Sequence, residues 1–204
     1  KAKRILKIID ASYEKSGYQS KLLSEIYGAT MLECMNIYDT QKKYDSVYHY
    51  YTKINEIITN QEILGKAELY LYRKKFYEKQ YFEAVYSLYN ALEYFKIAGA
   101  VDKEIITYIN LAQLFKKTQN KELSHQMDSI LMHNYLHKPI SKLLKIRVQM
   151  NHASYLASLG NNEEAIKILK NLNFADFSED GCVVKYYYSE LKCRYMKLNL
   201  IDSA

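Results

Sequence analysis

The chain has 204 residues, of which 49% are hydrophobic and 25% charged, the balance of a folded domain. Glycine occurs 6 times and proline once, so the composition predicts mostly α structure with short connections. The net charge of +6 comes from 29 basic and 23 acidic residues spread along the chain, and without a concentrated basic stripe we expect no direct binding of nucleic acid.

Two further features of the composition limit the class of protein. No run of 18 apolar residues occurs, so we expect no membrane-spanning segment. The three cysteines, Cys34, Cys182 and Cys193, are odd in number and form no CxxC pair, so neither a disulfide framework nor a zinc site is predicted. Unpaired thiols favour a reducing, cytoplasmic compartment, with the extracytoplasmic part of a membrane-anchored regulator as the alternative.

Apolar residues recur along the chain in a four-then-three spacing, which places them on one face of an α-helix. In chain order the triplets are Ala2–Leu6–Ile9, Val47–Tyr51–Ile54, Ala84–Leu88–Ala91, Leu123–Met127–Ile130 and Ala165–Leu169–Leu172, and Ala204 would open a sixth. Their first members are 37 to 45 residues apart, and a helical feature that returns at such a period predicts a helical repeat.

A second apolar helix precedes each triplet except the first. It carries a large anchor eight or nine residues upstream of the triplet: Tyr38, Phe76, Phe115, Leu156 and Tyr195. Each unit is therefore expected to be a longer helix, a short polar turn and a second helix, and short turns force the two helices to run antiparallel. The expected units are 1–16 (partial), 20–58, 62–98, 102–134, 140–173 and 182–204 (partial).

The stretch KKYDSVYHYYTKI at 42–54 contains four tyrosines. Its helical stripe is Tyr44, Val47, Tyr51 and Ile54. We expect Tyr44 and Tyr51 to be largely buried, Tyr50 to lie at the boundary or face the next unit, and Tyr48, about 100° round the helix from Val47, to be more exposed. The tyrosines are thus interpreted mainly as helix core.

Three stretches resemble the tetratricopeptide repeat (TPR) family: YLASLGNNEEAIKILKNL at 155–172, IYDTQKKYDSVYHYYTKI at 37–54 and FYEKQYFEAVYSLYNAL at 76–92. The resemblance covers essentially the whole chain and implies an all-α fold, a right-handed α-solenoid of antiparallel helix pairs with about five units, formed by residues 1–204 as a single array. The family's tryptophan is absent and Pro139 is the only proline. Neither end has the polar cap of a complete array, so we expect a fragment of a longer protein.

The resemblance also implies a concave binding face formed by the first helices. The expected inward residues are Leu32, Asn36, Tyr70, Lys74, Ile109, Gln113, Met150 and Ser154. Asn36 and Gln113 would hydrogen-bond the backbone of an extended peptide, between apolar pockets. The cluster of Lys, Arg and Asn with which chaperone-binding TPR proteins hold a terminal carboxylate is not reproduced. The alternative is that another part of the same protein fills the groove.

No pattern in the sequence predicts catalysis or a cofactor. The glycines form no phosphate-binding loop, and His133 and His137 lie four residues apart without an evident third metal ligand. We therefore expect no enzyme activity, no metal and no cofactor.

The leading hypothesis is a non-catalytic module that binds a protein or peptide, or another domain of the same polypeptide. Degenerate arrays of this kind resemble the sensing or interaction segments of bacterial transcriptional regulators and signalling proteins. The alternatives are a receptor for a short signalling peptide and a scaffold made only of repeats. The sequence does not predict an oligomeric state.

Overall fold

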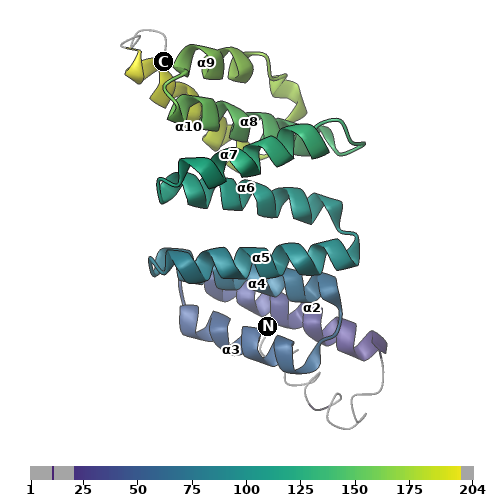
Figure 1. Cartoon of the computed structure of the whole chain (residues 1–204). Coiled ribbons are helices and arrows are strands. Elements are labelled where there is room, and N and C mark those ends of the chain that lie inside the picture. The colour runs from purple at the N-terminus through teal and green to yellow at the C-terminus, as the bar shows by residue number, and fades with distance from the viewer. Residues whose placement is uncertain (1–10, 12–20, 199–204) are drawn as a thin grey trace. The chain divides into compact units, whose positions relative to one another are not determined.

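The computed structural model describes residue 11 and residues 21–198 (Figure 1). These residues form nine α-helices and no strand, so the predicted all-α fold is confirmed for them. The helices are α2 (Lys21–Thr40), α3 (Tyr44–Ile57), α4 (Gln61–Tyr77), α5 (Tyr81–Ala98), α6 (Val101–Lys117), α7 (Lys121–Ile130), α8 (Lys142–Ser158), α9 (Asn162–Lys170) and α10 (Gly181–Lys197). A π-helical turn, η1 (Leu131–Tyr135), extends α7, and a 3-10 turn, η2 (Phe174–Asp176), precedes α10. The expected triplet Ala2–Leu6–Ile9 and the expected opening at Ala204 lie outside the described residues.

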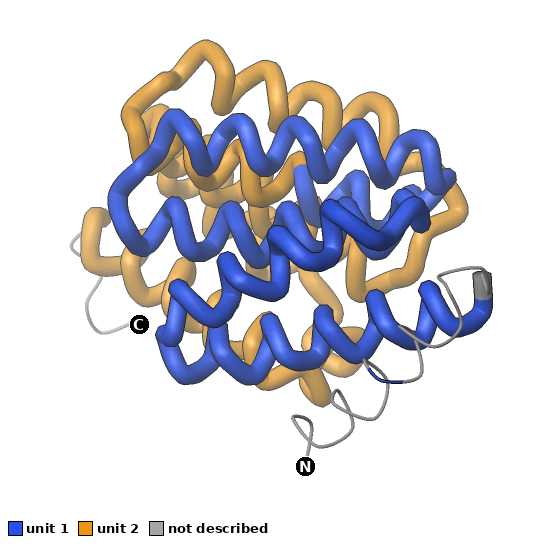
Figure 2. Tube along the Cα trace, turned by 90° about the horizontal axis from the view of Figure 1, so that it is seen from below, with its two compact units in different colours: residues 1–107 blue, residues 108–204 orange. Residues whose placement is uncertain are grey.

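The helices pack in two compact units, residues 1–107 and 108–204 (Figure 2). In the first unit α2 packs against α3 and α4, α3 also packs against α4, and α4 packs along α5. In the second unit α8 contacts α7, α9 and α10, and α9 contacts α10. Helices adjacent in the chain thus pack as neighbours, whereas the handedness of the array and the number of units stay predictions.

Four of the turns between paired helices share one backbone conformation. A residue with left-handed backbone lies two positions before α3, α5, α7 and α9; these residues are Lys42 (φ 56°), Lys79 (φ 62°), Gln119 (φ 60°) and Gly160 (φ 96°). In each turn the next N–H donates to the carbonyl five residues earlier: Lys43 to Tyr38, Gln80 to Lys75, Asn120 to Phe115, and Asn161 to Leu156, at 2.8–3.1 Å. This is the Schellman ending of an α-helix. Because it recurs at the same place, it gives the structural register of the repeat.

The position five residues after each left-handed residue is buried in every pair. Val47, Ala84 and Ala165 are each 0% exposed, which confirms their prediction as contact residues. In the third pair the equivalent residue is Ser124, at 4%. The small side chains among them allow the second helix to approach the first closely.

The predicted fourth triplet, Leu123–Met127–Ile130, is therefore wrong by one residue. The equivalent positions hold Ser124, Asp128 and Leu131, all buried, whereas Leu123 and Ile130 are only half-buried. Ser124 and Asp128 are polar residues at core positions, and a search for apolar spacing therefore selects the apolar residues next to them. The residue whose carbonyl accepts the N–H of the turn is Tyr38 in the first pair and Lys75 in the second. Lys75, not the predicted anchor Phe76, is therefore the equivalent of Tyr38.

The tyrosines of α3 also depart from expectation. Tyr50 is buried, at 8% exposed, and its ring stacks on Tyr38 with 5.8 Å between centroids, whereas Tyr44 and Tyr51 are half-buried. Tyr50 lies three residues after Val47 and four before Ile54, so these three share a face, and Tyr44 and Tyr51 lie at its edge, on the other side of Val47 from Tyr50. The prediction that Tyr48 is the more exposed residue is confirmed, at 48%.

Close helix contact in the first unit requires glycine on the first helices. A Cβ on Gly65 would lie 2.6 Å from the ring of Phe95, and a Cβ on Gly28 would lie 3.0 Å from Ile63 and 3.1 Å from Ile58. Phe95 and Ile58 each lie sixteen residues after the left-handed residue of their own turn. The two pairs therefore use the same contact, in which a glycine makes room for a large apolar residue at the end of the second helix.

We expect Ala84→Arg and Ala165→Arg each to lower the free energy of unfolding by roughly 3 kcal/mol or more, because each places an unpaired charge in a tight apolar contact. That loss corresponds to a fall in melting temperature of about 10 °C for a chain of this size. Glu163→Arg, at an exposed position of α9, is the control and should change stability by less than about 0.5 kcal/mol. Unchanged melting in both alanine variants would contradict the structural register.

Tyr50→Ala should cost about 3–5 kcal/mol, the range of buried aromatic truncations. Tyr48→Ala should cost less than about 1 kcal/mol, because nearly half of that side chain is already in water. Chemical denaturation of both variants beside the wild type measures the difference. Equal costs would show that α3 is buried on both sides.

Candidate functional site

The predicted binding residues of the first unit lie in different surroundings. Leu32 is 9% exposed and offers little surface, whereas Asn36, Tyr70 and Lys74 are half-buried. The Lys74 ammonium pairs with Glu78 at 2.7 Å, and it lies 5.9 Å from the centre of the Tyr48 ring on α3. Lys74 is thus held towards the second helix of the preceding pair.

The register given by the turns places Arg73, not the predicted Lys74, at the binding position of α4. Asn36, Gln113 and Ser154 each lie six residues before a left-handed turn residue, and in α4 that position is Arg73. Arg73 is exposed, and its guanidinium donates to Asp39 on α2 at 3.0 Å. The one-residue shift has the same origin as the misplaced anchor at Phe76.

In the second unit the predicted binding residues divide into apolar and polar pairs. Ile109 and Met150 are buried, at 9% and 1%, and belong to the core. Gln113 is half-buried and Ser154 is 2% exposed. Gln113 lines a cavity of about 10 Å³, room for about one water, together with Lys116 of its own helix and Tyr155 of α8.

Ser154 belongs to a group of polar side chains from three first helices, which we call the first-helix cluster: Lys116 on α6, Ser154 on α8, and Tyr186, Glu190 and Arg194 on α10. The Lys116 ammonium donates to Ser154 Oγ. The Arg194 guanidinium pairs with the Glu190 carboxylate one turn earlier on α10. Polar groups from α6, α8 and α10 therefore meet at one place within the second unit.

The first-helix cluster carries an excess of buried positive charge. Burial lowers the pKa of Lys116, and the Arg194 and Lys197 charges act in the same direction, while Glu190 opposes them. Arg194 is 6% exposed, and its Nε is buried without a hydrogen-bond partner among the described residues. Burial also raises the pKa of Tyr186 to about 12, so this hydroxyl stays neutral. Two cations face one carboxylate here, an arrangement that favours an added anion.

A serine beside a lysine can form a nucleophile and its base in hydrolases. Here Ser154 is 2% exposed and its Oγ accepts a hydrogen bond from Lys116.

A second polar group joins α7 to α8. His152 Nδ1 lies 2.7 Å from one carboxylate oxygen of Asp128, and Asn151 donates to the other at 3.4 Å. Close by, the Tyr155 hydroxyl lies 2.8 Å from His125 Nδ1. Asp128 is 3% exposed at a position that is apolar in the other pairs, so these contacts supply the partners that a buried carboxylate needs.

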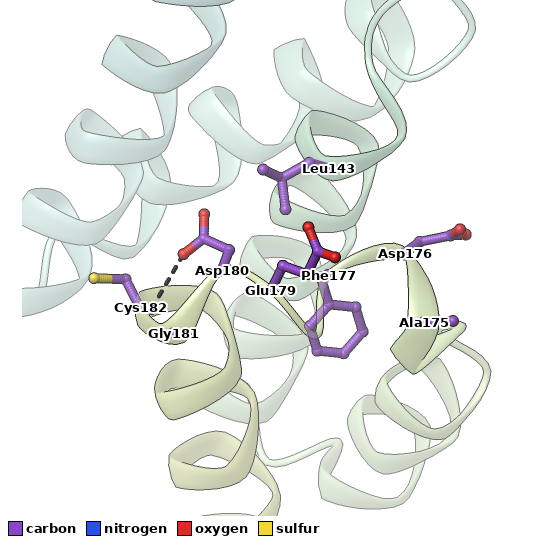
Figure 3. Close-up of a pocket in the computed structure, with 8 residues that line it drawn as sticks. All are labelled: Leu143, Ala175, Asp176, Phe177, Glu179, Asp180, Gly181 and Cys182. Atoms are coloured by element: carbon purple, nitrogen blue, oxygen red, sulfur yellow. Dashed lines mark hydrogen bonds between the residues drawn. The ribbon is translucent and has the colours of Figure 1, made fainter.

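A cavity of about 640 Å³ lies on the loop before α10 (Figure 3). Its lining residues are Leu143, Ala175, Asp176, Phe177, Glu179, Asp180, Gly181 and Cys182. Asp180 accepts the N–H groups of Cys182 and Val183 at 3.1 and 3.0 Å and pairs with Arg147 at 2.8 Å, and the hydrogen bond from Val183, followed by Arg147, lowers its pKa. Asp176 pairs with Lys142 at 3.4 Å. Two of the three carboxylates therefore already have structural partners.

The part of the chain that the structure describes contains no group of three or more His, Cys, Asp and Glu residues placed to hold a metal ion. His133 lies in the π-helical turn and His137 in the turn that follows it, so a regular α-helix does not carry the pair. No disulfide joins Cys34, Cys182 and Cys193, of which Cys34 is buried.

The first unit contains a buried carboxyl group that no sequence pattern marks. Glu68 is 2% exposed; its Oε1 accepts from the Tyr51 hydroxyl at 2.9 Å and from Asn90 at 3.3 Å, and its Oε2 has no partner among the described residues. Burial raises the pKa of Glu68, against the hydrogen bonds from Tyr51 and Asn90. No local signal distinguishes Glu68 from a solvated glutamate, because only the packing of α3 and α5 around it removes it from water.

The sequence matches no protein-family model, and the comparisons with curated proteins and with solved structures give no match. The TPR resemblance therefore stays a prediction. None of the described helices is long and apolar enough to cross a membrane.

The buried Glu68 predicts a pH dependence of stability. Its folded pKa lies above the unfolded value of about 4.5, so the folded state binds the proton more tightly. The contribution of Glu68 to stability is complete below the unfolded pKa and is lost as the pH rises through the folded pKa. Glu68→Gln cannot ionise, so its unfolding free energy should change less with pH in the range where Glu68 titrates. At a pH above the folded pKa of Glu68, this variant should be more stable than the wild type. Glu163→Gln, at an exposed position, is the control; an unchanged pH profile in Glu68→Gln would contradict the prediction.

Proposed function

We propose that the chain is a non-catalytic interaction module, a TPR-like right-handed solenoid whose first helices bind an extended segment of a protein or peptide. The observation that carries this proposal is the meeting of α6, α8 and α10 at the first-helix cluster, where polar groups gather on helices whose other inward positions are apolar. The four equivalent turns support it, because a helical repeat presents its first helices side by side.

The charge of the first-helix cluster favours an acidic ligand. Lys116 and Arg194 face Glu190 alone, and an anionic side chain or a carboxylate on the bound segment would compensate the second cation. Gln113 lies on the same helix as Lys116, three residues earlier, and its amide can hydrogen-bond a peptide backbone. The bound segment we propose is therefore an extended peptide with at least one carboxylate.

Two biological settings would use this surface. In the first the chain is the sensing or interaction segment of a larger bacterial transcriptional regulator or signalling protein, and the bound segment belongs to a partner or to another domain. In the second it is a receptor for a short signalling peptide, or a scaffold made only of repeats. Both settings require that the first helices bind a peptide, and a single selection experiment tests that binding.

Selection of a displayed random peptide library on the purified chain should enrich peptides that carry Asp or Glu. Lys116→Met and Gln113→Ala should each weaken binding of an enriched peptide by about tenfold or more. Lys121→Met, at an exposed position on the second helix α7, is the matched control and should leave binding unchanged.

Melting temperatures separate lost binding from lost structure. Lys116→Met should fold, because burial of the ammonium is unfavourable in the wild type. Enrichment no greater than on an unrelated helical protein would overturn the proposal. Peptides whose affinity survives both Lys116→Met and Gln113→Ala would move the binding surface away from the first-helix cluster.

A further inference from the structure

The outer face of α5 carries an exposed aromatic stripe formed by Phe82, Tyr86 and Tyr89. Their side chains are 84%, 66% and 42% exposed. Spacings of four and three residues put them on one side of the helix, opposite the face that buries Ala84 and Leu88. Ile97, at 63%, continues the same side towards the helix end.

This stripe is unusual among the second helices of the chain. The exposed positions of α7 and α9 are all polar or charged: Lys121, Glu122, His125 and Gln126 on α7, and Glu163, Glu164, Lys167 and Lys170 on α9. Single exposed apolar residues are ordinary, but contiguous patches of several hundred Å² mark interaction sites. The aromatic stripe exposes roughly 400 Å², if each aromatic side chain is taken as about 200 Å².

Opposite charges flank the aromatic stripe on its two sides. Lys79 lies seven residues before Tyr86 and Glu93 seven residues after it. Both side chains are exposed, and neither makes an ion pair within the described part of the chain. When two copies of α5 cross antiparallel at Tyr86, Lys79 of each copy faces Glu93 of the other. Parallel copies would instead place like charges together.

We propose that α5 forms the interface of a homodimer, in which two copies of this chain pack the aromatic stripe antiparallel about a two-fold axis at Tyr86. A two-fold interface uses the same patch on both copies, so it must be self-complementary, and the placement of Lys79 and Glu93 meets that requirement. Glu93 lies seven residues along α5 from Tyr86, roughly 10 Å at a rise of about 1.5 Å per residue, and Lys79 lies in the turn two residues before α5, so the two ion pairs flank the aromatic centre.

The size of the aromatic stripe sets the strength of the dimer. An apolar centre of roughly 400 Å² per copy is about half of the area that each partner buries in a standard interface. The remainder is the polar rim that carries the two ion pairs. We therefore expect a reversible dimer with a dissociation constant on the order of micromolar.

Sedimentation velocity and light scattering over a concentration series should show the wild-type chain passing from monomer to dimer. Phe82→Ser and Tyr86→Ser should each raise the dissociation constant by about tenfold or more, without a change in melting temperature, because both side chains are exposed in the single chain. Tyr48→Ser, at the exposed tyrosine of α3, is the matched control and should leave the dissociation constant unchanged.

Charge reversal tests the antiparallel arrangement directly. Lys79→Glu and Glu93→Lys should each weaken self-association, because each variant opposes like charges in both pairs. An equimolar mixture of the two variants should form a heterodimer, since the introduced glutamate then faces the introduced lysine while the two unaltered residues face each other. A chain that stays monomeric up to about 200 µM, single reversals that leave the dissociation constant unchanged, or a mixture that fails to associate would each overturn the proposal.

Discussion

Each helix pair depends on the turn that ends its first helix. A left-handed residue stops the helix, and the following N–H reaches a carbonyl five residues back, which fixes the direction in which the second helix starts. The residue five positions later then always meets the first helix. In the third pair that residue is Ser124, which is buried like its apolar equivalents and donates to the carbonyl of Ala112 at 3.4 Å. The turn geometry, more than the hydrophobicity of the contact residue, therefore holds the register.

Buried polar groups differ from pair to pair and distinguish the units from one another. Asp128 has partners for both carboxylate oxygens, whereas Glu68 keeps one oxygen unpaired and has a raised pKa. Lys116 and Arg194 add an uncompensated positive charge to the first-helix cluster. On α5 the pattern is broken in the opposite way, because the aromatic side chains of Phe82, Tyr86 and Tyr89 are exposed to water. Places where a sequence breaks its own pattern are the ones expected to serve binding.

The candidate site was partly predictable. The repeat placed Gln113 and Ser154 on the inner side of the first helices, and the structure finds Lys116 beside both. Tyr186, Glu190 and Arg194 were not among the predicted inward residues, because the unit to which they belong was predicted only in part. The pair of lysines at 116–117 gave no sign of which one turns inward. That choice depends on α8 and α10, which lie more than twenty residues further along the chain.

The all-α fold and the period of its helix pairs followed from the sequence alone, because scarce glycine and proline and a helical apolar spacing are local properties. The burial of Val47, Ala84 and Ala165 followed for the same reason. Only the tertiary structure decided which of two adjacent side chains is buried. It buries Tyr50 where Tyr51 was predicted, and Ser124 where Leu123 was predicted. A shift of one residue turns a side chain by about 100° round a helix. The turns fix that angle, and three of their four left-handed residues, Lys42, Lys79 and Gln119, lack the glycine that would have marked them.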